Sequence, residues 1–238
     1  MEVTLTSERA REPQLRAASH PRVKICCISS IEEAWLAISY GASALGLVSE
    51  MPSGPGVISE DSIREIAAIT PPAVASFLLT CKQDAPSIIE QQRRSRVNTI
   101  QLCDRLESSC YHELRDALPG VSIVQVIHVS GAQSVDEAVA VAPYVHGILL
   151  DSGNQTLNVK ELGGTGRTHD WNLSRKIREA VDVPVFLAGG LKPTNIAEAV
   201  RRVEPFGVDV CSGVRTDGKL DEAKLSDFFQ NIANTSKK

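Results

Sequence analysis

Short apolar runs alternate with longer segments of helical spacing along almost the whole chain, and this alternation limits the fold more than any other feature. Eight runs are rich in residues that favour strands. They are Val23–Cys27, Ala44–Val48, Val74–Leu79, Thr99–Leu102, Ser122–His128, Gly147–Asp151, Val185–Ala188 and Gly207–Cys211. Each is followed by a segment whose apolar residues have the spacing of an amphipathic helix. These segments are Ile31–Tyr40, Asp61–Ile69, Pro86–Ser95, Tyr111–Ala117, Val135–Val141, Asn172–Val181, Asn195–Val203 and Lys224–Ile232.

Strict alternation of strand and helix predicts right-handed crossovers and a parallel sheet. Runs that are apolar at nearly every position, such as Gly147–Asp151, fit parallel strands covered on both faces. Eight units in 238 residues fit one closed barrel better than an open doubly wound sheet of about five or six strands. We therefore predict an α/β protein with a single (β/α)8 TIM barrel over residues 23–238. The extension of residues 1–22 lacks clear periodicity, and both a disordered segment and a cap on the barrel bottom stay open.

The composition argues against several classes of protein. A net charge of −4 without a long basic run argues against a surface that binds nucleic acid. An aromatic content of 4% leaves few side chains that could stack on bases. No apolar run approaches the roughly 20 residues of a membrane helix, and the N-terminus lacks the apolar stretch of a signal peptide. The six cysteines include no CxxC or Cys/His ligand spacing, which predicts reduced thiols, no metal site and a cytoplasmic location. Both a monomer and a homodimer fit this composition.

Active sites of such barrels gather at the C-terminal ends of the strands. Here those ends carry thiol, acid and base groups, namely Cys26 and Cys27, Cys103 and Asp104, His128, Asp151, and Cys211 with Ser212. Cys26 as a thiolate base and Asp151 as a carboxylic acid would suit proton abstraction beside a carbonyl or imine. Structural alternatives stay open: a buried cysteine that packs as a small hydrophobe, an aspartate that caps a helix, and a structural His128. For Lys24, on the first predicted strand, the structural alternative is an ion pair with a carboxylate inside the barrel.

Three glycine-bearing loops follow the last three predicted strands. Backbone N–H groups in such loops can approach a phosphate closely, and barrels often bind phosphate at the loops after strands 7 and 8. The sequence therefore predicts a small phosphorylated ligand, and the alternative is that the glycines only form tight turns. The phosphate-binding candidates are Gly164, Thr165 and Gly166, Gly189 and Gly190, and Ser212 and Gly213.

Taken together, these motifs resemble the phosphoribosylanthranilate isomerase family of tryptophan biosynthesis. The resemblance runs from about Val23 to the last predicted helix, in the segments Val23–Cys26, Gly41–Gly46, Ile100–Leu102, Leu149–Ser152, Gly163–Trp171, Leu187–Leu191 and Val208–Val214. It implies a single barrel that converts an aminoaldose to an aminoketose by an Amadori rearrangement, without metal or organic cofactor. It also implies that Cys26 is the base that removes the sugar C2′ proton and Asp151 the acid that protonates the ring oxygen. The substrate phosphate would lie on the three glycine-bearing loops.

The chain departs from the family pattern on the active face. Cys27 replaces the glycine of the KICG motif, and Gly54-Pro55-Gly56 replaces the S-P-R segment whose arginine holds the anthranilate carboxylate. In the QLHG motif Gln101 is kept, whereas Cys103 and Asp104 replace the last two residues. Further substrate-facing candidates are Lys24, Cys27, Gln101, Cys103, His128 and Arg167. Arg167 or Arg215 could replace the missing arginine. The alternatives are a paralogue acting on another phosphorylated compound and a non-catalytic barrel that binds a phosphate ligand.

Overall fold

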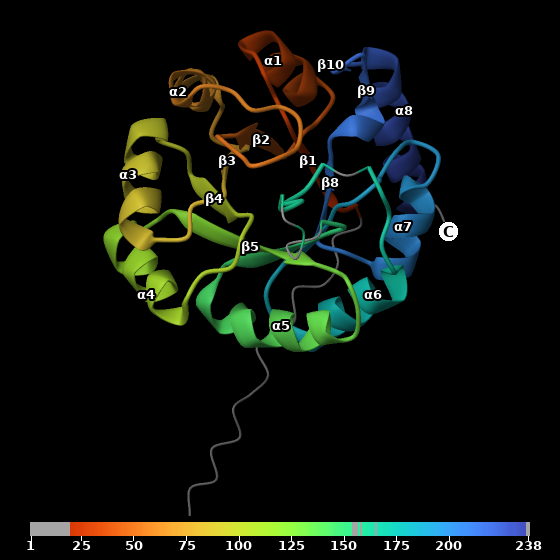
Figure 1. Ribbon diagram of the computed structural model, residues 1–238. Coiled ribbons are helices and arrows are strands. Elements are labelled where there is room, and N and C mark those ends of the chain that lie inside the picture. Colours follow the sequence, from red (N-terminus) through yellow and green to blue (C-terminus); the bar gives the residue numbers. More distant parts are fainter. Residues whose placement is uncertain (1–19, 154–156, 158, 165, 237–238) are drawn as a thin grey trace, which may run out of the picture.

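The computed structural model describes residues 20–153, 157, 159–164 and 166–236. Eight parallel strands form a closed barrel in sequence order, and β1 pairs with β8 to close it (Figure 1). The strands are β1 Arg22–Ile25, β2 Ala44–Val48, β3 Ala75–Thr80, β4 Thr99–Leu102, β5 Ser122–His128, β6 Gly147–Asp151, β7 Val185–Leu187 and β8 Gly207–Val210. The predicted (β/α)8 barrel is confirmed.

One helix follows each strand and covers the outside of the barrel (Figure 1). The helices are α1 Ile31–Ser39, α2 Glu60–Ile69, α3 Ala85–Ser95, α4 Ser108–Ala117, α5 Gln133–Val141, α6 Trp171–Ala180, α7 Ile196–Val203 and α8 Glu222–Ala233. Short elements complete the described chain: η1 Ala142–Tyr144, η2 Ser212–Val214, η3 Asn234–Ser236 and a hairpin of β9 Arg215–Thr216 and β10 Lys219–Leu220. Side-chain caps at Ser30, Ser59, Asp84, Asp170 and Asp221 begin five of the helices.

Most element bounds agree with the sequence to within a residue or two, and the small differences at β1 and β8 matter for the site. β1 ends at Ile25, so Cys26 and Cys27 lie beyond it, and Cys27 has a left-handed backbone (φ 61°) that cannot continue a strand. β8 ends at Val210, before Cys211. α4 begins at Ser108, three residues before the predicted start. Glu107 at its N-cap forms no side-chain capping bond, so no capping residue in the sequence marked this beginning.

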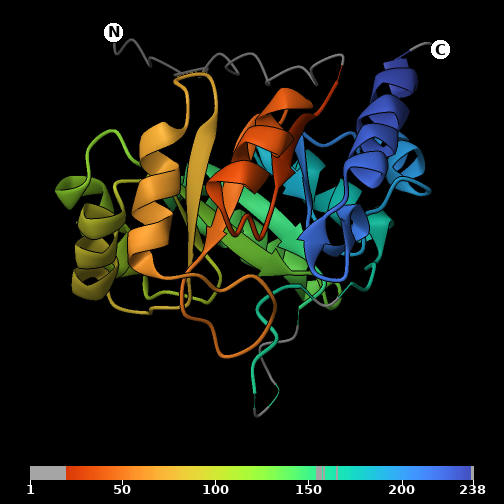
Figure 2. The ribbon, with the colours of Figure 1, turned by 90° about the horizontal axis from the view of Figure 1, so that it is seen from above.

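The apolar core has two layers. One lies between the barrel and its helices, and the other fills the barrel interior with side chains such as Phe77, Val124, Leu149 and Phe186. The β2–α2 loop and described parts of the β6–α6 loop project from the end of the barrel opposite to the last turn of α8 (Figure 2). Arg22, the last residue of the predicted extension, already pairs with Gly207 on β8, whereas residues 1–19 lie outside the described part. No helix in the described residues is long and apolar enough to cross a membrane.

Candidate active site

A cavity with about 700 Å³ of empty space, part of it open to solvent, lies at the C-terminal end of the barrel strands. Its walls come from the ends of β1, β4, β6, β7 and β8 and from the β2–α2 and β6–α6 loops. It brings together ten of the residues that the sequence predicted for the site: Cys26, Cys27, Gln101, Cys103, Asp151, Gly164, Gly166, Gly189, Gly190 and Ser212. Predicted Thr165 lies outside the described residues.

Cys26 follows β1 directly and its side chain points into the barrel mouth. Its backbone N–H donates to the carbonyl of Val210 (2.8 Å), which extends the pairing of β1 with β8 by one residue. A β-carbon placed on Gly46 of β2 would lie 2.8 Å from Cys26 Sγ and 3.0 Å from Lys24 Nζ. Only glycine therefore fits at this position of β2, and its absent side chain leaves room for the sulfur and the ammonium group on the same side of the barrel.

Lys24 lies one layer below the cavity and is fully buried. Its Nζ donates to Asp209 Oδ1 on β8 (2.9 Å), which confirms the alternative that this lysine pairs with a carboxylate inside the barrel. Burial lowers the pKa of Lys24, but the charge and hydrogen bond of Asp209, together with the neighbouring thiol groups, raise it more strongly, so the net pKa is raised. A permanent positive charge thus lies beneath the cavity floor.

Asp151 ends β6 and its carboxyl group lies in the wall of the cavity. Oδ1 accepts a hydrogen bond from the backbone N–H of Ser152 (2.7 Å), and a β-carbon on Gly163 would lie 2.9 Å from Oδ2. Burial raises the pKa of Asp151, and the Ser152 hydrogen bond and the charge of His128 only partly oppose that effect. The carboxyl group is therefore poised to hold a proton at a higher pH than an exposed aspartate.

Two further cysteines of the mouth, Cys27 and Cys211, meet across the seam between β1 and β8. Sγ of Cys27 and Sγ of Cys211 lie 2.7 Å apart, and the Cys27 thiol donates to the Pro55 carbonyl (3.6 Å). A β-carbon on Gly56 would lie 2.5 Å from Cys27 Cβ. The side chain at 27 thus occupies the space beside Gly56, so the two departures from the family pattern compensate each other in volume.

The glycine-bearing loops pack on one another through their backbones. A β-carbon on Gly190 would lie 2.7 Å from the carbonyl carbon of Arg167, and one on Gly213 would lie 1.9 Å from the carbonyl oxygen of Leu191. Gly166 and Gly189 have left-handed backbones (φ 67° and 80°). Gly213 packs behind the cavity wall, whereas Gly166, Gly189, Gly190 and Ser212 line it. Several backbone segments from β6–α6, β7–α7 and the end of β8 thus converge on one side of the cavity.

The β2–α2 and β6–α6 loops meet at the cavity. Ser53 Oγ donates to the carbonyl of Lys160 (2.7 Å), and Pro55 packs against Gly164, where a β-carbon would lie 2.6 Å from Pro55 Cδ. Lys160 also forms an ion pair with Asp104, which is buried after β4. The β2–α2 and β6–α6 loops therefore touch each other and hold to the barrel rim.

The remaining candidates occupy less direct positions. Gln101 lies in the cavity wall, and its buried Oε1 has no hydrogen-bond partner among the described residues. His128 lies outside the cavity lining and its Nε2 is 3.1 Å from the Cys103 carbonyl oxygen. Arg167 is exposed and pairs with Glu161. Arg215 pairs with Glu33 and donates to the Cys27 carbonyl (2.6 Å), behind the β1–α1 turn, so neither arginine stands beside Gly56.

Sequence reasoning placed Gly46 and Gly163 in the family segments without these contacts, and it missed the lining residues Met51, Ser53 and Leu162. An isolated glycine inside the β2 run was a usable sign of close approach. Nothing in the sequence indicated how far the β2–α2 loop reaches over the mouth. No group of three or more His, Cys, Asp or Glu side chains in the described part of the chain is arranged to hold a metal ion.

Comparisons with known proteins agree with this geometry. The family model of N-(5′-phosphoribosyl)anthranilate (PRA) isomerase matches residues 23–231. The N-(5′-phosphoribosyl)anthranilate isomerase of Methanocella arvoryzae is 33% identical over 215 residues, which are 90% of this chain and 99% of that protein. The solved phosphoribosyl anthranilate isomerase of Thermotoga maritima is 28% identical with a TM-score of 0.75 and coverage of 90% and 99%. Another, in complex with reduced 1-(O-carboxyphenylamino)-1-deoxyribulose 5-phosphate, is 27% identical with a TM-score of 0.73 and the same coverage. The chain therefore belongs to the phosphoribosylanthranilate isomerase family.

Proposed function

We propose that the protein is a sugar-phosphate isomerase that converts N-(5′-phosphoribosyl)anthranilate to its aminodeoxyribulose 5-phosphate isomer. The observation that carries the proposal is that Cys26 and Asp151 line one cavity together with the glycine-bearing loops after β6, β7 and β8. Substrate and product are isomers, so the two side chains need only move protons. The reaction then calls for an acid, a base and a site that holds the phosphate, and this cavity has candidates for all three.

The phosphate end fits the side formed by Gly166, Gly189, Gly190 and Ser212. Backbone N–H groups at such loops bind a phosphate without the bulk of side chains, and the Ser212 hydroxyl adds a donor. Binding the phosphate there would place the sugar ring over the barrel mouth, between β1 and β6.

Asp151 is the proposed acid. Its raised pKa keeps a proton available, and transfer of that proton to the ring oxygen lets the C1′–O bond break while the amine lone pair forms a C1′–N double bond. Gly163 leaves Oδ2 uncovered by a β-carbon. The acid can therefore be approached from the cavity.

Cys26 is the proposed base. Its thiolate removes the C2′ proton, the electron pair of that C–H bond forms a C1′–C2′ double bond, and the C1′–N double bond returns its electrons to nitrogen. The enol formed in this way becomes the aminoketose by proton transfer to C1′. The Lys24 ammonium group, on the same side of the barrel as Cys26 Sγ, complements the negative charge of the thiolate.

Steady-state turnover of freshly generated N-(5′-phosphoribosyl)anthranilate, followed by anthranilate fluorescence, tests the proposal. Removing a general acid or base typically costs about 10²- to 10⁴-fold in rate, so Cys26→Ala and Asp151→Ala should each lose that much. Cys110→Ala on α4 and Asp116→Ala, which is exposed on the same helix, are matched controls and should keep wild-type turnover. Equal turnover in the site variants and the controls would refute the assigned roles.

One observation favours a second candidate function, the same isomerisation of a phosphoribosylamine whose other end carries no carboxylate. None of the described residues that line the cavity is a lysine or arginine, whereas Asp151 and Asp209 both line it. A substrate carboxylate beside Gly56 would lack a charge-assisted partner, worth about 1.5–3 kcal/mol.

Comparison of N-(5′-phosphoribosyl)anthranilate with N-(5′-phosphoribosyl)aniline separates the two candidates. An enzyme that pairs the carboxylate should prefer the anthranilate in kcat/KM by about one to two powers of ten. Equal values, or a preference for the aniline compound, would support the second candidate.

A further inference from the structure

Cys27 and Cys211 form a thiol pair that the proposed isomerisation does not use. The two sulfurs lie 2.7 Å apart although the residues are 184 positions apart in the sequence. Cys27 lies in the β1–α1 turn next to Cys26, and Cys211 follows β8 immediately before Ser212. Both line the cavity. The pair therefore joins the proposed base to the proposed phosphate side.

The backbone at Cys27 shows that the thiol is held there at a cost. Its φ of 61° lies in the left-handed region, where glycine is favoured and another residue is strained. Gly56 lacks a side chain where a β-carbon would collide with Cys27. A glycine at 27 would be free of this strain.

The surroundings of the two thiols differ. The hydrogen bond between the sulfurs lowers the pKa of Cys211, and the positive charges of Arg215 and Lys24 act in the same direction against the effect of burial. The same hydrogen bond, with burial and Cys26, raises the pKa of Cys27. Cys211 is also the more exposed of the two. A half-buried thiol with a lowered pKa beside a second thiol is the arrangement of redox-sensitive cysteine pairs.

We propose that Cys27 and Cys211 are a redox modification site, which a peroxide oxidises to a reversible disulfide that closes the active site. The Cys211 thiolate attacks the peroxide, so an S–O bond forms, the O–O bond breaks and hydroxide leaves, which takes up the proton that Cys211 had released and becomes water. The Cys27 sulfur then attacks the Cys211 sulfenic acid, the S–O bond breaks and a second water leaves with the Cys27 proton. Two thiols are oxidised and one peroxide is reduced, and a dithiol reverses the change.

Oxidation would alter the cavity at three points. The sulfurs must approach from 2.7 Å to about 2.05 Å, which draws the β1–α1 turn toward the residue before Ser212. The Cys27 thiol would no longer donate to the Pro55 carbonyl, one of the contacts that hold the β2–α2 loop. The disulfide would also fix Cys27, the residue next to the proposed base Cys26, in a new position. Loss of turnover is the expected result, and this part of the inference rests on the proposed function.

The other mouth cysteines are poorer partners. Consecutive Cα atoms are about 3.8 Å apart across a trans peptide, below the roughly 4.4 Å that an ordinary disulfide needs, and the described chain has no cis peptide bond. A bond between Cys26 and Cys27 would therefore be strained. Cys103 is almost fully buried, and burial raises its pKa. Oxidation should select Cys27 with Cys211.

Peptide mapping of the full chain tests the site. After brief treatment with hydrogen peroxide and alkylation, tryptic digestion without reductant should give residues 25–64 linked to residues 203–215, and dithiothreitol should separate them. The linkage should be absent in Cys27→Ser and Cys211→Ser and present in the matched control Cys110→Ser. A link that persists in Cys27→Ser, or peroxide-treated wild-type protein without the linkage, would overturn the proposal.

Closure of the active site by the disulfide is tested by measuring the turnover of each variant before and after peroxide treatment. Wild type and Cys110→Ser should lose turnover and regain it with dithiothreitol, in step with the linkage. Full turnover of linked protein would overturn the closure. If reduced protein turns over neither phosphoribosylamine while the linkage still forms, the proposed function fails and the modification site stands.

Discussion

Lys24 and Asp209 occupy the same register position on the paired strands β1 and β8, and Nζ of the lysine lies 2.9 Å from Oδ1 of the aspartate. The lysine is fully buried and the aspartate is 8% exposed. The pair closes the barrel at the seam where the first and last strands meet. It also holds a positive charge below Cys26, so it contributes to stability and to the chemistry above it.

Removing one partner of this pair should be far more costly than removing a surface pair. Asp209→Ala leaves a buried ammonium group without a counter-charge, and we expect a loss of about 3–5 kcal/mol in the free energy of unfolding. Asp61→Ala, which breaks an exposed pair with Arg64, should cost about 1 kcal/mol or less. Urea unfolding measures both. Similar small losses would show that the buried pair contributes little.

Asp151 should make the protein less stable as the pH rises. Its native pKa is raised above the ordinary value of 3.8, mainly by burial, so the native state binds the proton more tightly than the unfolded chain. The stabilisation is complete below the unfolded pKa and is lost as the pH rises through the native pKa. Asp151→Asn should therefore raise the unfolding midpoint at neutral pH while it removes turnover. A lower midpoint at neutral pH would contradict the assigned burial cost.

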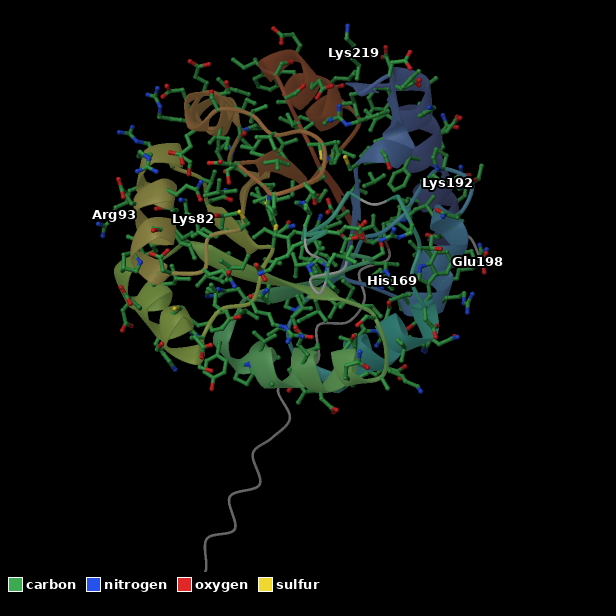
Figure 3. All side chains as sticks on the ribbon, in the orientation of Figure 1. Lys82, Arg93, His169, Lys192, Glu198 and Lys219 are labelled. Atoms are coloured by element: carbon green, nitrogen blue, oxygen red, sulfur yellow. The ribbon has the colours of Figure 1, made fainter. Side chains whose placement is uncertain are left out.

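His169 should make the protein less stable as the pH falls, the opposite of the effect of Asp151. It lies inside the ring of helices, whereas Arg93 and Lys219 lie at its outer edge (Figure 3). Its Nε2 lies 2.7 Å from Ser174 Oγ, and burial lowers the pKa of His169 from 6.5 to about 4. Because the native state resists protonation, stability is complete above the unfolded pKa and is lost as the pH falls from 6.5 toward 4.

This loss should be on the order of 1 to 3 kcal/mol, and His169→Gln should remove most of it. Unfolding free energies of both proteins across the acid range give the comparison. His112→Gln on α4, where the histidine is exposed, is the matched control and should keep the wild-type pH dependence. An unchanged acid slope in His169→Gln would assign the loss to other groups.

The sequence predicts the barrel well because each strand and helix carries its own local pattern. Gly147–Asp151 and Ser122–His128 have the predicted bounds, and the rule that barrel sites lie at strand ends places Cys26 and Asp151 in one cavity. Contacts between distant loops leave no local pattern. The approach of Cys27 to Cys211 depends on how the chain bends beyond the ends of β1 and β8, which sequence spacing does not encode.

Gly163→Ala should impair the acid rather than the fold as a whole. A β-carbon at 163 would lie 2.9 Å from Asp151 Oδ2, and the backbone there has a φ of 143°. Displacing a catalytic group by about 1 Å can cost roughly a hundredfold in rate, so we expect a large fall in kcat. Gly218→Ala in the β9–β10 turn is the matched control, because it has the same kind of left-handed strain (φ 77°) with nothing near its β-carbon. Both variants should lose about 1 kcal/mol of stability from backbone strain, whereas Gly218→Ala should keep its turnover. Parallel losses of turnover in the two variants would mean that strain alone, and not contact with Asp151, explains the effect.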